Sequence, residues 1–373
     1  MRDALRGFNA IVFKEVRHVR RDPTTFVFAL LIPLVQMIVL GFAIDTNVRQ
    51  VTTVIYDEDH TREARELVDR LRNSDTFRVV GYVASGGELN EAIVSGRARV
   101  GVRIPPDYSR DLLRGRQAQV LVLIDGSDSS VAAQALNVST AIGLDESMKR
   151  TLGEGFLLPI QMRPRLLFNP DSRSPNFFLP GLMSVLLMMS TTLLTAFSLV
   201  REKEGGTLEQ LFVTPVRPLG LLLGKITPYF GIGLLEFSFI LIGTRFIFGV
   251  PIHGSVLLLV LLTLPYLFTD LAIGILISSK AETQPQALQL TFSILLPSIF
   301  LSGYIFPRET MPLFFYGLSF LLPATYYTNI ARGVILRGAG IVHLWVNGLV
   351  LLLMGIGLLL IAARRFRKKV IAT

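Results

Sequence analysis

Long apolar runs alternate with short polar segments over most of this chain. Several runs reach the ~20 residues that an α-helix needs to cross the ~30 Å hydrocarbon core of a bilayer. The pattern indicates an α-helical membrane protein. The sequence predicts six transmembrane helices, at 25–44, 177–200, 221–249, 254–279, 288–306 and 345–363.

Residues 45–176 follow a different pattern, in which strand-forming and helix-forming segments alternate. Such alternation predicts an α/β domain with one sheet. This domain is inserted between the first and second spans, and we expect it to be extracytoplasmic. The strand-forming runs lie at 51–56, 77–83, 99–104 and 118–124, and the helical patterns lie at 60–73, 86–96, 107–115 and 129–152.

Polar residues punctuate this domain at the places where its elements meet. Ser85 followed by Glu88 fits a capping box at a helix start. Acidic residues follow two of the expected strands, where they fit either ion ligands or helix caps and turns, and the second interpretation is favoured. These acidic residues are Asp57, Glu58, Asp59, Asp125 and Asp128.

Three further segments lie outside the spans and the inserted domain. In residues 1–24, apolar residues recur at helical spacing between basic ones, which predicts a cytoplasmic amphipathic helix at the membrane interface; a plain tail is the alternative. Residues 307–337 hold an apolar stretch too short to cross, which predicts an outer re-entrant hairpin. Residues 364–373 form a basic cytoplasmic tail. The recurring apolar residues near the N-terminus are Leu5, Phe8, Val12, Val16 and Val19.

The composition supports a membrane protein, and the distribution of charge orients it. Of the 373 residues, 51% are apolar and 17% are charged, which excludes an ordinary soluble protein. Lys and Arg number fifteen in the termini and loops on one side of the six spans, and three in the short loops on the other side. This bias places both termini in the cytoplasm, so the net charge of +9 orients the chain and does not indicate nucleic acid.

The chain lacks the motifs of an enzyme. It has no cysteine, and its four histidines are scattered, so no cysteine or paired-histidine metal site is present. Gly224-Lys225 fails as a phosphate-binding loop because Ile226 follows it and position 219 is Leu. The sequence therefore predicts a non-catalytic chain without metal or cofactor.

Residues 201–215 form a charged segment between two apolar runs. A charged connection between two spans has to face water, because the bilayer core cannot satisfy exposed polar groups. The segment also carries an apolar stripe of Leu208, Leu211 and Phe212, which suits docking onto a soluble partner.

This segment and motifs along the whole chain resemble the permeases of ABC transporters of the second exporter type. The similar group is the YbhS/YbhR/YhhJ-like one, which has a large extracytoplasmic domain after the first span. The block at 200–229 is the most specific part of the resemblance. The other motifs are Asn169-Pro170, Phe178-Leu179-Pro180-Gly181-Leu182, Ile277-Ser278-Ser279, Leu301-Ser302-Gly303-Tyr304, Pro307 and Met311-Pro312.

The resemblance implies a half-transporter in the bacterial inner membrane. It would pair with a second permease subunit, the same or homologous, and with an ABC ATPase that binds ATP and Mg; it leaves a periplasmic adaptor open. It also implies that 201–215 is the coupling helix to the ATPase. The residues assigned to coupling are Arg201, Glu202, Glu204, Thr207, Leu208, Glu209, Leu211, Phe212 and Pro215.

One position departs from related chains. Position 205, commonly Arg there, is Gly here and precedes Gly206. Each glycine weakens a helix by roughly 1 kcal/mol relative to alanine. We therefore expect the helix to break at 205–206 and its rigid part to start at Thr207.

Charged residues inside the spans are candidates for a transport pathway because burying them in a bilayer is costly. Glu236 lies about 22 Å along the third span, near its middle, at ~1.5 Å per residue. We expect it to face a cavity and meet a cationic substrate, with a packing contact between helices as the alternative. The other pathway candidates are Asp270, Thr192 and Thr195.

Three functions fit these features. The favoured one is the permease subunit of an ATP-driven exporter of amphiphilic substrates, drugs or lipid-like compounds. The alternative is an ATP-driven mechanotransmitter or envelope sensor that acts through its extracytoplasmic domain. A secondary transporter is disfavoured because an ion-coupled carrier needs no segment that docks an ATPase.

Overall fold

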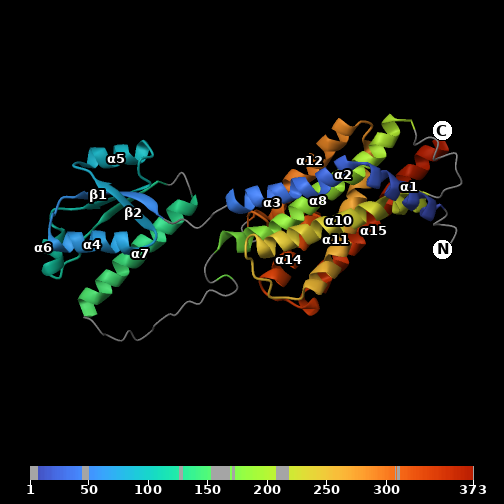
Figure 1. Ribbon diagram of the computed structural model, residues 1–373. Helices are drawn as coiled ribbons and strands as arrows, with labels where there is room; N and C mark the ends of the chain where they lie inside the picture. Colours follow the sequence, from blue (N-terminus) through green and yellow to red (C-terminus); the bar gives the residue numbers. More distant parts are fainter. Residues whose placement is uncertain are drawn as a thin grey trace. The chain divides into compact units, whose positions relative to one another are not determined.

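The computed structural model describes residues 7–43, 50–125, 129–152, 169, 173–206, 218–306, 308 and 311–372. The chain divides into two compact units. One unit is Asp45–Arg165, and the other combines Met1–Ile44 with Leu166–Thr373. Figure 1 shows the elements of both units.

The Asp45–Arg165 unit is built on a mixed four-stranded sheet with the strand order β2-β1-β3-β4. β1 pairs in parallel with both β2 and β3, while β4 pairs antiparallel to β3. Parallel neighbours need a crossover connection, and α4 supplies it between β1 and β2. The strands are β1 (Val51–Asp57), β2 (Phe77–Tyr82), β3 (Val100–Ile104) and β4 (Leu121–Ile124).

Helices pack on both faces of this sheet. Successive strand residues point to opposite faces, so Val54 and Ile55 of β1 enter different cores. Ile55 packs with residues of α4, α6 and α7, while Val54 packs with Leu89 and Ala92 of α5. The helices of this unit are α4 (Arg62–Asn73), α5 (Gly86–Val94), α6 (Tyr108–Leu113) and α7 (Ser129–Leu152).

The capping box at the start of α5 forms in a shifted version. The Ser85 hydroxyl accepts a hydrogen bond from the backbone N–H of Glu88 at 3.2 Å, as a capping box requires. The Glu88 carboxylate, however, accepts from the N–H of Ala84 at 2.8 Å, one residue before the cap itself.

The acidic residues after the strands form turns, side-chain hydrogen bonds and ion pairs. Asp57 Oδ1 accepts from the N–H groups of Asp59 and His60 at 3.0 and 3.1 Å. Asp59 accepts from the hydroxyl of Ser109, also at 3.0 Å. Glu58 and Asp125 pair with arginines, and Asp128 lies outside the described residues. No described group of three or more His, Asp or Glu side chains is arranged to hold a metal ion.

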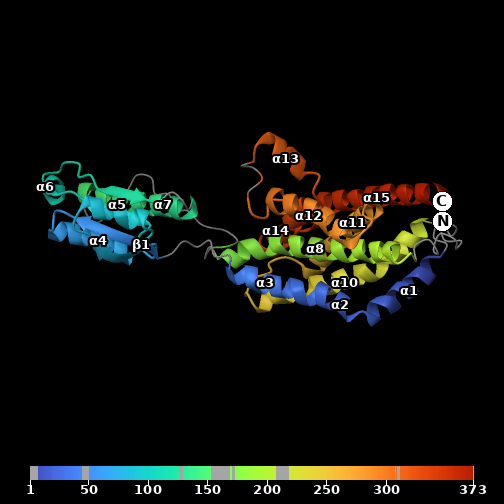
Figure 2. The ribbon, with the colours of Figure 1, turned by 90° about the horizontal axis from the view of Figure 1, so that it is seen from above.

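The other unit is a bundle of long helices. α8, α10, α11 and α15 run side by side, as Figures 1 and 2 show. A five-residue π-helix, η2, interrupts the first apolar helix. The elements are α1 (Phe8–Arg21), α2 (Pro23–Phe26), η2 (Val27–Leu31), α3 (Ile32–Ala43), α8 (Ser174–Glu204), α10 (Pro218–Phe246), α11 (Val256–Lys280), α12 (Gln284–Leu301), α13 (Leu313–Ser319), α14 (Pro323–Ile335) and α15 (Ile341–Ala372).

Four described helices are long and apolar enough to cross a membrane: α8, α10, α11 and the Ile341–Phe366 part of α15. The first expected span corresponds to a shorter apolar helix, Val27–Ala43. The fifth, expected at 288–306, corresponds to α12, which is 18 residues long and is not among the four. α12 ends at Leu301, before Gly303 takes a positive φ of 87°.

Residues 311–335 form two helices in different surroundings, α13 and α14. α14 is almost wholly buried and packs on α8, α11 and α15. α13 exposes large apolar side chains, and Figure 2 shows it beside α12. The same views place α1 and the last turns of α15 at one end of the bundle.

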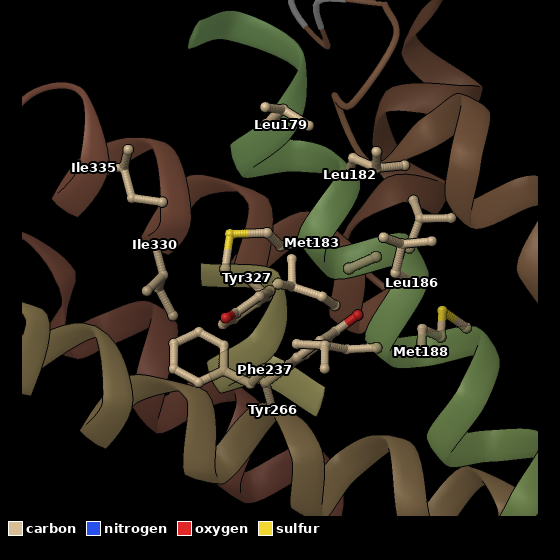
Figure 3. Packing of buried hydrophobic residues seen from close by; sticks show 14 of the residues in the cluster. Leu179, Leu182, Met183, Leu186, Met188, Phe237, Tyr266, Tyr327, Ile330 and Ile335 are labelled. Atoms are coloured by element: carbon tan, nitrogen blue, oxygen red, sulfur yellow. The ribbon is translucent and has the colours of Figure 1, made fainter. Parts of the chain in front are cut away.

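The centre of the bundle combines apolar packing with hydrogen bonds between tyrosines and neighbouring helices (Figure 3). The rings of Tyr266 and Tyr327 stack with their centroids 4.1 Å apart. The Tyr266 hydroxyl donates to the carbonyl oxygen of Ser184 at 2.6 Å, and the Tyr327 hydroxyl bonds that of Thr263 at 2.9 Å. These bonds fix α8, α11 and α14 against one another because a buried polar group without a partner is costly.

Candidate coupling site and cavity

α8 ends at two consecutive glycines, as the sequence predicts. The N–H groups of Gly205 and Gly206 donate to the carbonyl oxygens of Arg201 and Lys203 at 3.0 and 3.1 Å. Gly206 has a φ of 65°, a left-handed conformation that glycine adopts without the strain that a Cβ brings. Six coupling candidates lie outside the described residues: Thr207, Leu208, Glu209, Leu211, Phe212 and Pro215.

The last turn of α8, Arg201–Glu204, is described, and we call it the charged end of α8. Glu202 Oε2 lies 2.8 Å from Lys225 Nζ of α10, and Glu202 Oε1 lies 2.5 Å from Lys14 Nζ of α1. Lys225 Nζ is also 2.9 Å from Oε1 of Glu15 on α1, so this ammonium lies between two carboxylates. We call Lys14, Glu15, Glu202 and Lys225 the four-charge cluster.

The four-charge cluster is buried at its centre. The side chains of Lys225 and Glu15 are 1% and 3% exposed, whereas that of Lys14 is 47% exposed. Burying a charge costs several kcal/mol unless opposite charges and hydrogen bonds compensate it. Here the two positive and two negative charges balance, and each carboxylate contacts both ammonium groups.

Arg201 forms a more exposed pair with the segment after α1. Its Nη1 lies 3.3 Å from Oδ2 of Asp22, and the two side chains are 51% and 17% exposed. Asp22 is the residue that separates α1 from α2. An exposed pair of this kind contributes little to stability and separates easily.

Lys203 and Glu204 bind the ends of two neighbouring helices. The Lys203 ammonium donates to the carbonyl oxygens of Ser278 and Ala281 at the carboxyl end of α11. The Glu204 carboxylate accepts from the backbone N–H and the side-chain amide of Gln284, at 2.9 and 2.6 Å, at the amino end of α12. A cation at a helix carboxyl end and an anion at an amino end both match the helix dipole.

Four successive side chains of α8 thus connect this helix to four others and to the α1–α2 junction. The sequence predicts Arg201, Glu202 and Glu204 as functional but says nothing of Glu15 or of the burial of Lys225.

The buried face of α1 differs from the face that the apolar pattern predicts. Ile11, Glu15 and Val19 are buried, whereas Val16 is 39% exposed. The physical reason is that α10 presents an ammonium to α1, so the protein-facing side of α1 includes a carboxylate. Leu5, the first residue of the predicted stripe, lies outside the described residues.

A cavity of about 490 Å³ lies along α8. Its walls are mostly apolar and come mainly from α8, α12 and the η2–α3 helix, with His18 of α1 and Tyr229 of α10. Its polar side chains gather at the charged end of α8, with Gln36 and Ser190 further along. The polar lining residues are His18, Asp22, Arg201, Gln284, Ser198, Gln36 and Ser190, and the apolar ones include Phe28, Ile32, Leu186, Met189, Leu193, Phe197, Leu288 and Phe292.

Glu236 lies behind this cavity and does not line it. It is 1% exposed, and its Oε2 accepts a hydrogen bond from the hydroxyl of Ser190, which does line the cavity. Glu236 Oε1 has no hydrogen-bond partner among the residues that the structure describes.

The other predicted pathway residues pack between helices. Asp270 is fully buried, and its backbone carbonyl accepts from the hydroxyl of Thr192 at 3.3 Å. The Thr195 hydroxyl donates to the carbonyl oxygen of Thr191 in its own helix. The structure therefore brings Thr192 and Asp270 together, and places Glu236 next to the cavity through Ser190 only.

The sequence of the bundle matches a known transporter family. The family described as ABC-2 family transporter protein matches residues 23–364, which cover both units. The chain belongs to this family. The match runs through all the helices that carry the four-charge cluster except α1, which precedes residue 23.

The sequences of several relatives align with most of this ABC-2 permease. The Escherichia coli protein named probable multidrug ABC transporter permease YbhS is 30% identical over 367 residues, which cover 96% of this chain and 97% of the relative. Its counterpart YbhR is 30% identical over 337 residues, 90% and 91% of the two chains. The inner membrane transport permease YhhJ is 32% identical over 289 residues, 76% of each chain.

Proposed function

We propose that this chain is the membrane permease subunit of an ATP-driven ABC exporter that moves amphiphilic molecules outward. One observation carries the proposal: α8 both lines the cavity and ends in the charged turn that is bound to four other helices. A movement imposed on that turn therefore reaches the cavity wall through a single continuous helix.

The cavity chemistry supports an amphiphilic substrate. Aromatic and aliphatic side chains form most of its wall, and charged and amide side chains are concentrated at one end. An apolar body would lie against Met189, Phe197 and Phe292, and a polar head would meet Asp22 or Arg201. A volume of about 490 Å³ falls in the range of sites that hold drug-sized ligands. The relatives YbhS and YbhR carry multidrug names, which agrees with such cargo.

The charged segments support an assignment of sides. With α1, the charged end of α8 and the tail of α15 in the cytoplasm, basic residues gather inside and the α/β unit within 45–176 faces outward. In this topology the first apolar helix and α12 also cross, which gives six spans. The hairpin of α13 and α14 then lies on the outer side.

The proposed partners follow from the absence of any ATP-binding motif in this chain. A separate ABC ATPase supplies hydrolysis and binds ATP and Mg, and it docks on the coupling segment 201–215. A second permease subunit completes the transporter. No nucleic acid is involved.

Glu236 has a proposed role behind the cavity wall. Because the Ser190 hydroxyl is its bonding partner and also lines the cavity, a cationic head group that displaces this hydroxyl would reach the carboxylate. An intramembrane acid without a paired cation is a functional candidate by default.

The deciding experiment is the ATPase activity of the permease purified with its ATPase in lipid nanodiscs. We expect the double variant Glu209→Ala/Leu211→Ala to lose either ATPase binding or permease-stimulated hydrolysis, because both residues lie on the proposed docking segment. The matched control is Glu91→Ala/Val94→Ala, which makes a similar acidic and apolar truncation on exposed positions of α5.

Substrate movement is tested in parallel with the dye Hoechst 33342 in inverted membrane vesicles. ATP-dependent uptake that the double variant abolishes and the control retains supports an exporter. Stimulated hydrolysis without movement of this dye or of a panel of amphiphiles would instead favour the mechanotransmitter. Wild-type chain that neither binds nor stimulates the ATPase would contradict the proposal.

A further inference from the structure

Three helices that are distant in sequence meet at the four-charge cluster: α1, α8 and α10. We infer that α1, the charged end of α8 and the first turns of α10 move as one rigid body, with Lys225 as the positioning residue that holds them together. This inference rests on the proposed function, because the motion concerned is the one that the ATPase drives.

The burial of Lys225 is the first reason. Its ammonium contacts Glu15 at 2.9 Å and Glu202 at 2.8 Å, and its side chain is 1% exposed. Separating either helix from α10 would leave a carboxylate or the ammonium buried without its partner, which is far costlier than separating an exposed pair. We therefore expect α1, the charged end of α8 and α10 to keep their positions relative to one another.

The second reason is the close approach of α1 to α10 next to this lysine. A Cβ placed on Gly224 would lie 2.8 Å from Ile11 Cβ and 3.2 Å from the carbonyl oxygen of Phe8. Both distances are shorter than ordinary carbon contacts, so α1 rests directly on the α10 backbone. Val19 of α1 and Leu222 of α10 belong to the same buried apolar cluster, which extends this contact.

Two other bonds of the charged end of α8, those of Arg201 and Glu204, are more exposed and mark the border of the body, whereas Lys203 also binds the carboxyl end of α11. Arg201 is half exposed in its pair with Asp22, and Glu204 is exposed where it binds Gln284. Such contacts exchange readily with water. Movement is therefore expected at the contacts with α12 and the α1–α2 junction, and not inside the four-charge cluster.

In this arrangement α1 helps to transmit motion, and a movement of α8 is passed on to α10. Lys225 and Glu236 lie on one helix, 11 residues or about 16 Å apart. A displacement of the charged end of α8 would carry α10 with it and shift Glu236 relative to the cavity. α1 would add rigidity to this body and would not act only as an anchor at the membrane surface.

A disulfide across the α1–α10 contact tests the rigid body. The chain contains no cysteine, so Ile11→Cys/Gly224→Cys introduces a single pair, and a shift of less than about 2 Å brings it to the 3.5–4.5 Å Cβ separation of a disulfide. The complex with its ATPase is assayed in nanodiscs, oxidised and then reduced. We expect permease-stimulated hydrolysis to be equal in both states. A loss on oxidation that reduction reverses would overturn the inference.

Charge variants test the positioning role of Lys225. We expect Lys225→Met to retain the ATPase but to lower stimulated hydrolysis at least about fivefold, the lower end of typical coupling between sites. Lys225→Arg keeps a cation between Glu15 and Glu202 and should retain most of the stimulation. A Lys225→Met permease that is fully inserted, binds the ATPase and is stimulated like wild type would overturn the role.

The outcomes separate this inference from the proposed function. If the reduced cysteine pair and the wild-type chain both fail to stimulate the ATPase, the proposed function is wrong. If both stimulate it and only the oxidised pair fails, the exporter proposal stands and the rigid body is wrong. Membrane insertion of each variant, measured by its yield after size-exclusion chromatography, identifies misfolding in either case.

Discussion

Two carboxylates lie at different levels of α8, Glu202 on the helix itself and Glu236 on the neighbouring α10, and they are compensated in different ways. At its charged end, Glu202 lies within 2.8 Å of one lysine and 2.5 Å of another. Further along, Ser190 of the same helix donates a hydroxyl hydrogen bond to Glu236 of α10, which is 1% exposed. Glu236 Oε1 has no partner within the described ranges.

This difference suggests that the four-charge cluster is structural, whereas Glu236 is a candidate for function. Opposite charges and several short contacts make the four-charge cluster self-sufficient, so it needs no ligand to be stable. Glu236 has no such compensation, and an apolar residue at its position would be cheaper to bury. The pathway role proposed for Glu236 rests on this difference, because one of its carboxyl oxygens lacks a hydrogen-bond partner among the described residues.

The largest loss of stability is expected when the four-charge cluster is disrupted. Lys225→Met leaves Glu15 and Glu202 buried without their shared ammonium, and removing one partner of a buried ion pair typically costs about 3–5 kcal/mol. Thermal unfolding of the purified permease, followed by aggregation or tryptophan fluorescence, should show a marked drop in the midpoint.

Lys14→Met is the control for this prediction. It removes the same charge from the same cluster, but the Lys14 side chain is 47% exposed. Exposed pairs contribute about 0–1 kcal/mol, so the midpoint should change little. Equal losses for Lys14→Met and Lys225→Met would show that burial does not distinguish the two lysines, which would remove the basis of the comparison.

The next effect compares the two carboxylates by the same substitution. Glu202→Gln removes a charge that two ammonium groups contact, and hydrogen bonds to charged groups are worth about 1.5–3 kcal/mol. Glu236→Gln keeps the shape of the side chain and removes a carboxyl group that no described cation contacts, so the permease should unfold at nearly the wild-type temperature. Its transport of cationic amphiphiles should fall, measured against a neutral amphiphile as the control.

Either result on Glu236→Gln is informative. Unchanged transport of every cation tested would show that Glu236 is a packing contact, and the proposed pathway role would be wrong. A permease that is as destabilised as Glu202→Gln would show that Glu236 is compensated by groups outside the described residues.

A smaller effect is expected at Ser190, the link between Glu236 and the cavity. Ser190→Ala removes the hydroxyl that donates to Glu236, and losing one partner of a buried hydrogen bond costs about 1–3 kcal/mol. Ser238→Ala is the matched control because this serine is exposed and donates only to the carbonyl oxygen of Leu234 in its own helix. Thermal midpoints of the two variants should differ, with Ser190→Ala the lower.

The sequence predicts local features of this fold well. The strands of the α/β unit and the caps of its helices depend on short patterns, and they are found within a few residues of their expected positions. The break at Gly205-Gly206 is also local, since two glycines end a helix whatever surrounds them. The bounds of α12 are predicted less accurately, because glutamines and serines among its apolar residues make the ends of the helix hard to recognise.

The candidate site depends on contacts that the sequence does not display. Glu15 and Lys225 are 210 positions apart, and each belongs to a helix whose pattern gives no reason to pair them. One signal was present: Glu15 is spaced by four residues from both Ile11 and Val19, so a carboxylate occupies the middle of a potential buried face. The sequence does not identify Lys225 as its partner, because that pairing depends on the packing of α1 against Gly224.

The smallest stability effect, and the most specific functional one, is expected at Asp22 and Arg201. Both side chains line the polar end of the cavity, and their 3.3 Å pair includes an arginine that is 51% exposed. Asp22→Asn should therefore cost no more than about 1 kcal/mol.

The functional effect depends on whether the pair closes this end of the cavity at rest. If it does, breaking it should raise basal ATP hydrolysis or dye uptake, and more so at low salt, where the wild-type pair is strongest. The charge exchange Asp22→Arg/Arg201→Asp should return both rates toward wild type. Rates that stay at the wild-type value in Asp22→Asn at every salt concentration would show that the pair is only a surface contact.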